Sequence, residues 1–248
     1  MREGLGLLRS LLLYRRPGRQ RGLRRFYRAF VAPGDLVFDV GAHLGDRSAA
    51  FAALGARVVA LEPHPRIARW LERLTRGNER ITVRAVALGR APGEGTLRMS
   101  RRTPTVSTLS RAWSRRMPDA NPGFHGVRWD GEVTVPVTTL DALIAEHGVP
   151  TFCKIDVEGY EAEVLEGLSQ PVNALSFEFV QGSLDVAAAC VRRLEALGQY
   201  EFNTAAGEGR RLRLGEWTTG AALLDWLEAG AGGAPSGDVY ARIHPSVP

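Results

Sequence analysis

A regular alternation of apolar runs with amphipathic stretches, beginning near residue 35, is the feature that most constrains the fold of this chain. The apolar runs are 36–40, 57–63 and 81–89, and the helical patterns between them are 46–55 and 65–78. The apolar runs are short and rich in branched residues, as buried strands are, and the intervening patterns repeat at helical spacing. This β-α-β-α-β rhythm is typical of a parallel sheet with helices on both faces.

The C-terminal half continues the same alternation. Helices are expected at 138–148, 160–168 and 184–198, and strands at 151–159 and 172–180. A hairpin, a short helix and a final strand are expected at 200–217, 219–230 and 238–243. We therefore predict an α/β protein with a Rossmann-like, doubly wound, mostly parallel seven-stranded sheet and an antiparallel excursion at its end.

The rhythm breaks between residues 100 and 131, a segment rich in Ser, Thr, Pro, Gly and Arg. An unpatterned connection of this length is usually functional or disordered. The flanking runs 95–99 and 132–137 can pair as strands and project the segment as a lid. We therefore divide the chain into a basic N-terminal helical extension, residues 1–30, and one α/β domain, residues 31–248.

The first predicted strand runs into a glycine-bearing turn, VFDVGAHLGD (37–46). In doubly wound sheets, turns at the carboxyl ends of strands hold ligands. Gly41 allows the backbone to approach a ligand closely, and Gly45 allows the next helix to start tightly. The spacing is G-x-x-x-G rather than the G-x-G-x-x-G of dinucleotide sites, and the chain has no G-K-[ST], so neither a dinucleotide nor a P-loop nucleotide is favoured.

Two acids flank this turn in the predicted sheet. Asp39 lies two residues before Gly41, where it would repel a pyrophosphate but suit an ammonium group. Glu62 closes the second strand, 21 residues after Gly41, where an acid accepts both hydroxyls of an adenosine ribose. An adenosine ligand with an ammonium group and no phosphates is S-adenosylmethionine. The alternatives are a helix N-cap role for Asp39 and a plain surface position for Glu62.

Four stretches together resemble the FkbM-type methyltransferases, a branch of the class I S-adenosylmethionine-dependent enzymes. They are VFDVGAHLGD, LEPHP (61–65), VTTLDAL (137–143) and KIDVEGYEAEVLEG (154–167). The likeness covers about residues 35–180, and TTLD followed by KIDVEGYE is its most specific part. The glycine turn, in contrast, is common to all class I methyltransferases. The C-terminal tail is similar to a bacterial subset of the family.

The resemblance implies methyl transfer from S-adenosylmethionine to a hydroxyl on a glycan or secondary metabolite, by a domain spanning residues 31–248. Together with the acids above, it assigns cofactor contacts to one set of residues: Asp39, Gly41, Ala42, His43, Gly45, Glu62, Pro63, Ala87 and Asp156. His43 stands where the family pattern has Asn. It therefore either contacts the carboxylate of the cofactor or contributes through its backbone alone.

An acidic turn follows the fourth long apolar run and faces the methyl group in this fold. A hydroxyl acceptor must lose its proton, and a carboxylate acting as general base adds roughly 10²–10⁴-fold to the rate. We assign this role to Asp156 or Glu158. Lys154, the third residue of the predicted catalytic set, lies on the same side of the strand as Asp156 and is expected to pair with Asp156 or Glu178. Glu178, inside an apolar strand, is either a paired core group or a substrate ligand.

Other chemistries find less support. No metal site is expected, because no His or Asn completes a ligand set around these acids. His125 in the lid is a further candidate for the base. The lid arginines either meet an anionic acceptor or are solvated: Arg101, Arg102, Arg111, Arg115 and Arg116.

Two alternative functions stay open, a nicotinamide-dependent oxidoreductase and a binding protein that kept the fold without the catalysis. N-methylation of nucleic acid or protein is disfavoured, because DVEGY replaces the Asn/Asp-Pro-Pro-aromatic turn of such enzymes.

Composition bears on partners and location. The net charge is +5, but Lys154 is the only lysine, so 31 of the 32 basic residues are Arg. This skew indicates a GC-rich genome, and no nucleic-acid partner is expected. The chain has no apolar run near the roughly 18–20 residues of a membrane span. Cys153 and Cys190 have no metal-ligand neighbours, so we expect buried free thiols. Together these features favour a cytoplasmic protein. The Arg-rich N-terminal helix is open to three interpretations, namely capping of the site, docking of a partner and contact with a membrane surface, and the sequence does not indicate an oligomeric state.

Overall fold

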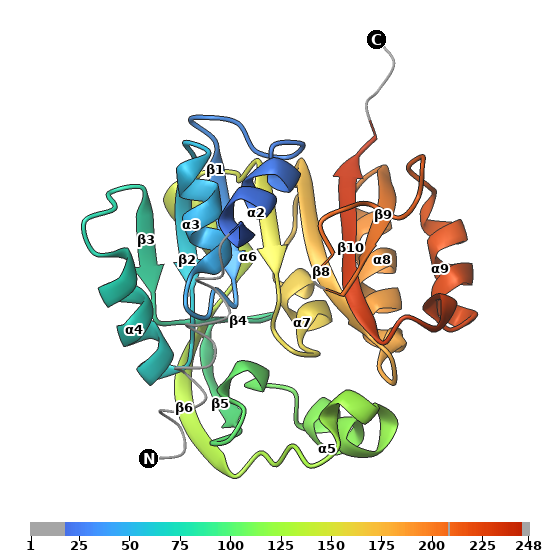
Figure 1. Ribbon diagram of the computed structural model, residues 1–248, viewed down its shortest axis with the longest axis horizontal. Coiled ribbons are helices and arrows are strands. Elements are labelled where there is room, and N and C mark those ends of the chain that lie inside the picture. The colour runs from blue at the N-terminus through green and yellow to red at the C-terminus, as the bar shows by residue number, and fades with distance from the viewer. Residues whose placement is uncertain (1–17, 208, 245–248) are drawn as a thin grey trace.

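The computed structural model describes residues 18–207 and 209–244. Its main sheet has seven strands in the order β3-β2-β1-β7-β8-β10-β9 (Figure 1). The parallel strands are β3 (Ile81–Arg84), β2 (Arg57–Leu61), β1 (Leu36–Val40), β7 (Phe152–Ile155) and β8 (Ala174–Val180). β10 (Ser236–Ile243) runs antiparallel to both of its neighbours, β8 and β9 (Tyr200–Ala206), so β9 runs in the same direction as the parallel strands. The predicted doubly wound, mostly parallel seven-stranded sheet is confirmed.

Helices cover both faces of this sheet (Figure 1). One face carries α2 (Arg19–Tyr27), α3 (Asp46–Ala53) and α4 (Pro65–Thr75). The other carries α6 (Leu140–His147), α7 (Glu161–Glu166), α8 (Leu184–Leu197) and α9 (Gly220–Glu228). Because side chains alternate along a strand, Val37 packs into the first layer and Phe38 into the second. Cys153 and Cys190 are buried free thiols, as expected.

The predicted strand at 81–89 is wrong as one element. β3 ends at Arg84, opposite Leu61, the last residue of β2, because the parallel pairing runs out there. The chain then leaves the main sheet, and β4 (Ala87–Leu88) joins a second sheet of order β4-β6-β5. In this sheet β5 (Gly93–Met99) and β6 (Gly131–Thr138) pair antiparallel, which confirms the pairing predicted for the runs that flank the lid.

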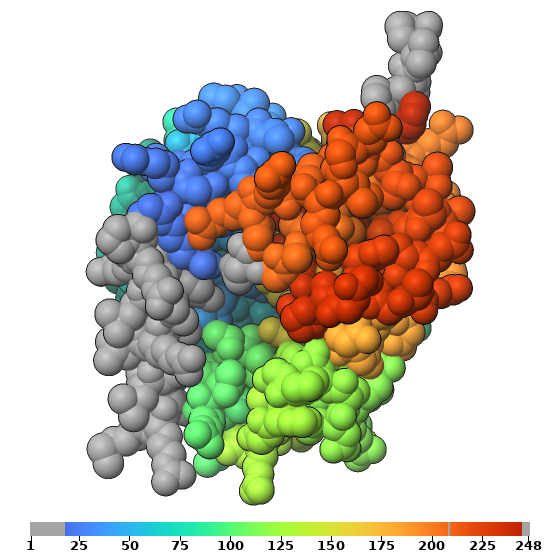
Figure 2. Space-filling model, turned by 45° about the vertical axis from the view of Figure 1, so that its right-hand side comes forward, coloured from blue at the N-terminus to red at the C-terminus, as the bar shows by residue number. Residues whose placement is uncertain are grey.

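The segment 100–131 is more ordered than its sequence indicates. It contains the helix α5 (Arg111–Ala120), whose buried side is formed by Trp113 and Met117, one helical turn apart. These side chains pack on Val180 of the main sheet, and Trp113 Nε1 donates a hydrogen bond to Ser183 Oγ at 3.1 Å. Figure 2 shows the segment (green) along one end of the molecule, against later parts of the chain (gold and orange). The lid segment is therefore packed against the main sheet.

The predicted hairpin at 200–217 is also wrong. The partner of β9 is β10, which follows some thirty residues later in the chain. Residues 209–218 return alongside β9 and meet it through an isolated antiparallel bridge between Phe202 and Thr218 and a hydrogen bond from Arg213 N to Thr204 O. An apolar alternation indicates a strand but does not say which strand pairs with it.

The N-terminal extension, predicted over residues 1–30, is described from residue 18, and residues 1–17 lie outside the described part. Within it, α2 buries Leu23 and Tyr27 against the α3 side of the sheet. Along the described stretches of the chain, the structure has no helix with the length and apolar character that a membrane crossing requires.

Candidate active site

A cavity of about 420 Å³ lies at the carboxyl ends of the central parallel strands. Its walls come from the glycine turn after β1, the end of β2, β4, the acidic turn after β7, and the lid between residues 104 and 109. β1 lies between β2 and β7, which is where the order of the strands reverses along the chain. The cavity therefore occupies the topological switch point, where doubly wound sheets bind their ligands.

Gly41 forms the floor of this cavity at the point where two turns meet. Its φ is +78°, in the left-handed region. A Cβ at this position would lie 1.8 Å from the carbonyl oxygen of Asp156. The amides of Gly41 and Ala42 both donate to the carbonyl oxygen of Leu61, at 2.9 Å each. The turn after β1 is thus held against both the end of β2 and the acidic turn, and only glycine fits.

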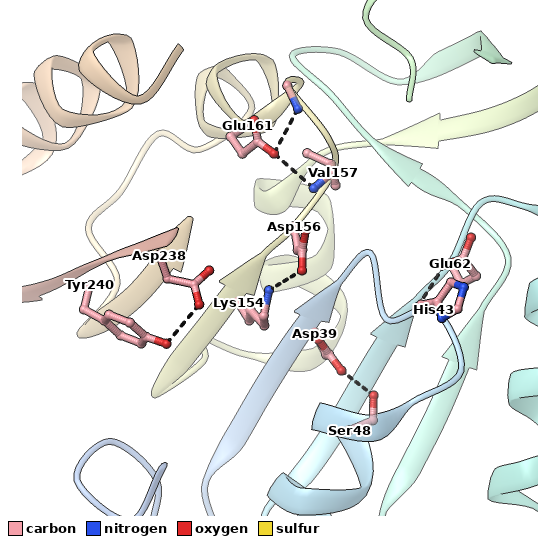
Figure 3. Close-up of polar contacts among 11 residues, drawn as sticks. Asp39, His43, Ser48, Glu62, Lys154, Asp156, Val157, Glu161, Asp238 and Tyr240 are labelled. Carbon is pink, nitrogen blue, oxygen red and sulfur yellow. Dashed lines mark hydrogen bonds and ion pairs between the residues drawn. The ribbon is translucent and has the colours of Figure 1, made fainter. Parts of the chain in front are cut away.

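Glu62 is held by two backbone amides. Its carboxylate oxygens accept a hydrogen bond from His43 N at 2.9 Å (Figure 3) and one from His64 N at 2.8 Å. The residue is 6% exposed and lines the cavity. Burial raises its pKa to about 7, although the two amides oppose that shift. Each carboxylate oxygen has a second lone pair, so this fixed carboxylate can also accept the two hydroxyls of a ribose. The plain surface position is therefore wrong.

His43 contributes through its backbone. Its φ is +50°, which is uncommon outside glycine, and this turn aims its amide at Glu62. Burial lowers the pKa of its imidazole to about 4, so the ring is neutral at pH 7. Of the two roles expected for His43, the backbone role is present. The neutral ring gives no ionic attraction for a carboxylate.

Asp39 is buried at the end of β1, with 1% of its surface exposed, and lines the cavity. It accepts a hydrogen bond from Ser48 Oγ of α3 at 2.5 Å. Burial raises its pKa, while the bond from Ser48 and the charge of Lys154 lower it. The N-cap of α3 is Gly45, with no side-chain cap. The alternative that Asp39 caps this helix is therefore wrong.

The predicted pairing of Lys154 is confirmed for Asp156. Lys154 Nζ lies 2.7 Å from Asp156 Oδ2, and the lysine side chain is 1% exposed (Figure 3). Burial opposes both charges, but each charge stabilises the other, so the pKa of Lys154 is raised and that of Asp156 is lowered. Lys154 does not line the cavity. Lys154 therefore keeps Asp156 ionised from a buried position outside the cavity lining.

The acidic turn after β7 is fixed from two sides. Glu158 and Gly159 both have positive φ, +56° and +81°. On the side of α7, Glu161 Oε1 accepts hydrogen bonds from Val157 N at 3.1 Å and Gly159 N at 3.2 Å. On the side of the lid, Trp113 lies so close that a Cβ on Gly159 would be 2.1 Å from its ring. Left-handed backbone in a non-glycine residue stores strain and often marks functional turns.

Three carboxylates converge on one wall of the cavity. Asp156, Glu158 and Glu178 each place an oxygen within 4.8 Å of the others, a geometry that a divalent cation can use. Glu158 Oε2 and Glu178 Oε2 are buried without a hydrogen-bond partner among the described residues. Burial and the neighbouring negative charges raise the pKa of Glu158 and of Glu178 well above the ordinary value. Glu178 is thus a cavity residue, and the expectation that no metal takes part stays a prediction.

The remaining predicted residues fall into two groups. Ala42, Pro63 and Ala87 line the cavity as predicted for cofactor contacts. Gly45 does not line it, and a Cβ there would meet the side chain of Leu71 at 2.5 Å, so its role is the tight start of α3. The lid residues considered for substrate contact also lie outside the cavity lining: Arg101, Arg102, Arg111, Arg115, Arg116 and His125.

Several lining residues were not singled out from the sequence. Arg47 directly follows the motif VFDVGAHLGD and Tyr160 lies within KIDVEGYE, so their position offered a signal. Arg19 lies on α2, far from any motif, and reaches the cavity because α2 packs on α3. Its Nε lies 2.5 Å from Asp46 Oδ2. No local pattern predicts such a contact.

This arrangement, with a glycine turn, a fixed acid after β2 and an acidic turn after β7, defines a class I methyltransferase fold with its ligand cavity in place. The chain matches the methyltransferase FkbM domain over residues 39–199. That match covers more than half of the chain, and the protein belongs to the FkbM methyltransferase family.

A curated relative is the hexuronic acid methyltransferase AglP of Haloferax volcanii. It is 29% identical over 151 residues, which cover 59% of this chain and 55% of the relative. The chain therefore spans little more than half the length of that relative.

Solved structures also resemble the chain at low sequence identity. A precorrin-6y C5,15-methyltransferase from Geobacter metallireducens has 13% identity and a TM-score of 0.46, with 91% of this chain and 86% of that chain covered. A SAM-dependent O-methyltransferase from Thermotoga maritima has 13% identity and a TM-score of 0.42, with 94% and 67% covered. Fibrillarin from Aeropyrum pernix, with natively bound S-adenosyl-L-methionine, has 13% identity and a TM-score of 0.44, with 86% and 68% covered.

Proposed function

We propose that this methyltransferase uses S-adenosylmethionine and transfers its methyl group to a hydroxyl group of a glycan or secondary metabolite. The observation that supports this most directly is the Glu62 carboxylate. Two backbone amides fix it in the cavity wall, where it can accept both hydroxyls of a ribose. Asp39, on the neighbouring strand, lines the same cavity and suits the ammonium group of the cofactor.

The name of the relative supports a glycan acceptor. AglP is a hexuronic acid methyltransferase, and a hexuronic acid offers both hydroxyls and a carboxylate to a methyl donor. Asp156, which Lys154 holds ionised, lines the cavity and would repel an acceptor carboxylate. A hydroxyl on the sugar ring is therefore the better substrate for this site.

The chemistry requires alignment and the removal of one proton. The bound cofactor supplies an electrophilic methyl group. As the acceptor oxygen forms its bond to the methyl carbon, the carbon–sulfur bond breaks, its electron pair passes to sulfur, and the products are a methyl ether and S-adenosylhomocysteine. The hydroxyl proton passes to a carboxylate of the acidic turn. We assign the base to Glu158, because Asp156 is held ionised by Lys154 and is the weaker base.

Calorimetric titration tests the cofactor. We expect the wild-type protein to bind S-adenosylmethionine and S-adenosylhomocysteine but not NAD⁺. The Glu62→Gln variant should bind both adenosyl ligands at least about tenfold more weakly, because it loses charge-assisted hydrogen bonds to the ribose. Glu72→Gln, on the exposed side of α4, is the matched control and should bind as wild type does.

The other outcomes assign a different function. Preferential binding of NAD⁺ by the folded protein would support an oxidoreductase. A folded protein that binds none of the three ligands would support a non-catalytic binding protein.

Glu158→Gln tests the base. The rate of methyl transfer should fall by roughly 10²–10⁴-fold, with little change in the Kd for S-adenosylmethionine. Glutamine has nearly the size of glutamate but cannot accept the hydroxyl proton, so the cavity keeps its shape while the base is lost. Transfer of labelled methyl to a panel of hexuronic acid and neutral hexose glycosides measures the rate. Glu94→Gln, at an exposed position, is the control, and a Glu158→Gln enzyme that transfers methyl at the wild-type rate would remove Glu158 from the mechanism.

A further inference from the structure

The charges around the cavity are unevenly distributed. Six carboxyl groups line it: Asp39, Asp46, Glu62, Asp156, Glu158 and Glu178. The Lys and Arg side chains among the described lining residues are Arg19 and Arg47. His43 adds no positive charge, because burial lowers its pKa to about 4. The two arginines are thus the positively charged side chains among the described residues that line an otherwise acidic cavity.

S-adenosylmethionine carries charges of both signs. Its sulfonium and ammonium groups suit the acidic wall, but its carboxylate requires a cation or hydrogen-bond donors in a cavity lined by acids. Guanidinium groups match carboxylates in geometry and stay charged at all relevant pH values. By charge and by position, Arg19 and Arg47 are the groups that can receive this end of the molecule.

We propose that Arg19 and Arg47 bind the carboxylate of S-adenosylmethionine, and that α2 is therefore part of the cofactor site. This inference rests on the proposed function. It assigns a binding role to a helix that lies before the family match, which begins at residue 39. It also selects one of the three interpretations of the basic extension, the one in which it caps the site.

The contacts of α2 hold Arg19 at this place. Arg19 Nε and Gln20 Nε2 both donate to the carboxylate of Asp46, at 2.5 and 2.6 Å, and Gln20 Nε2 also reaches the carbonyl oxygen of Asp46 at 2.9 Å. Asp46 is the first residue of α3 and is 3% exposed in its side chain. Its carboxylate orients the guanidinium of Arg19 beside the turn that carries Gly41. Arg47, the next residue of α3, lines the same cavity.

The opposite end of α2 is anchored independently of the cavity. Leu23 and Tyr27 are buried, and the ring of Tyr27 packs on Phe51 of α3 with centroids 4.6 Å apart. Gly22 lies against the side chain of Arg210, where a Cβ would come within 2.3 Å of Nη1. In Figure 2 the blue surface of this region meets the orange surface of the C-terminal part. These contacts hold α2 in place without the bond to Asp46, so Arg19 can be replaced without removing the helix.

Paired titrations with three ligands test the proposal. The ligands are S-adenosylmethionine, its decarboxylated form S-adenosylmethioninamine, and 5′-methylthioadenosine, which lacks the amino acid part. We expect Arg19→Gln to weaken S-adenosylmethionine at least about tenfold, the order of one charge-assisted hydrogen bond, and to change the other two less than about threefold. Arg47→Gln should show the same selectivity. Arg21→Gln, at an exposed position of the same helix, is the control.

A double variant separates recognition from folding. Arg19→Gln leaves the buried carboxylate of Asp46 without its cation, so Arg19→Gln/Asp46→Asn removes both charges. If Arg19 recognises the carboxylate, the double variant still binds S-adenosylmethionine weakly and the two other ligands normally.

Three outcomes would overturn the proposal. Restored binding in the double variant would mean that Arg19 acts on Asp46 alone. Equal weakening of all three ligands would mean that α2 affects binding only by supporting the structure of the site, without recognising the carboxylate. A wild-type protein that binds none of the three would overturn the proposed function, and this inference with it, whereas adenosyl binding without selectivity in the variants overturns the inference alone.

Discussion

Alanine at position 41 is expected to destabilise the protein by roughly 2–5 kcal/mol and to abolish cofactor binding. The left-handed φ costs about 1–2 kcal/mol for a residue with a Cβ, and forcing a methyl group into a packed site costs about 1–3 kcal/mol more. The new Cβ would lie 1.8 Å from the carbonyl oxygen of Asp156. Neither strand end can retreat easily, because the amides of Gly41 and Ala42 are bound to Leu61 and that of Asp156 is bound to Val40.

Thermal unfolding and titration with S-adenosylhomocysteine measure the two effects. For a domain of this size the midpoint should fall by roughly 5–20 °C. Gly77→Ala is the matched control, because Gly77 also has a positive φ, +85°, but has no atom within 4 Å of the added Cβ. It should show the dihedral cost alone and keep its ligand affinity. Equal destabilisation by the two substitutions would show that the contact with Asp156 is unimportant.

Gly41 also shows why part of the site could be predicted from the sequence. Asp39 lies at the end of its strand, Glu62 and Asp156 follow theirs directly, and parallel strands bring their carboxyl ends to one edge of the sheet. Once the strands were recognised, a cavity lined by these residues followed from topology. The close approach of Gly41 to Asp156 was not predicted, because it depends on the register between β1 and β7.

The misassigned elements share a physical reason. A local apolar pattern reports burial but not the partner, so residues 81–89 read as one strand although β3 and β4 belong to different sheets. The same limit led to the hairpin at 200–217, since β9 pairs with the distant β10. The helix α5 was missed because it buries only a narrow side and contains Pro118, both weak helix signals.

Arg19 and Glu178 reach the site for reasons that no local pattern contains. Arg19 is placed by the packing of α2 on α3, and Glu178 by the position of β8 beside β7. Because Glu178 is a carboxylate in an apolar strand, the sequence indicated that it has a special role. The sequence did not decide between a paired core group and a ligand of the substrate. The pairing of Glu178 with Lys154 is not formed, because the ammonium group of Lys154 binds Asp156.

Asp156→Asn is the second substitution with a large expected effect, a loss of about 3 kcal/mol of stability at pH 7. Removing one member of a buried ion pair leaves the other charge uncompensated, at a cost of about 3–5 kcal/mol. The lower end applies here, because the side chain of Asp156 is 28% exposed although that of Lys154 is only 1% exposed. Urea unfolding of wild type and variant measures the difference.

The loss should shrink as the pH rises. In the wild type, burial disfavours the ammonium group, but Asp156 and Asp238 raise the pKa of Lys154 above its usual value. Without Asp156 we expect burial to dominate, so that the folded-state pKa falls below the unfolded value of about 10.4. Between those two values the folded protein then binds fewer protons than the unfolded chain, and stability increases with pH. The same destabilisation at pH 7 and at pH 9.5 would show that Lys154 does not carry the effect.

Lys154→Met/Asp156→Asn completes the argument, because it removes both charges. Replacing a buried ion pair with neutral groups of similar volume is often neutral or stabilising, so this double variant should unfold close to the wild-type midpoint. It should nevertheless transfer methyl groups poorly. Burial raises the pKa of Glu158, and the negative charge of Asp156 raises it further. Without that charge Glu158 becomes a weaker base. Recovery of stability without recovery of the transfer rate would assign the Lys154–Asp156 pair to catalysis, whereas recovery of both would make it a structural pair that the reaction does not need.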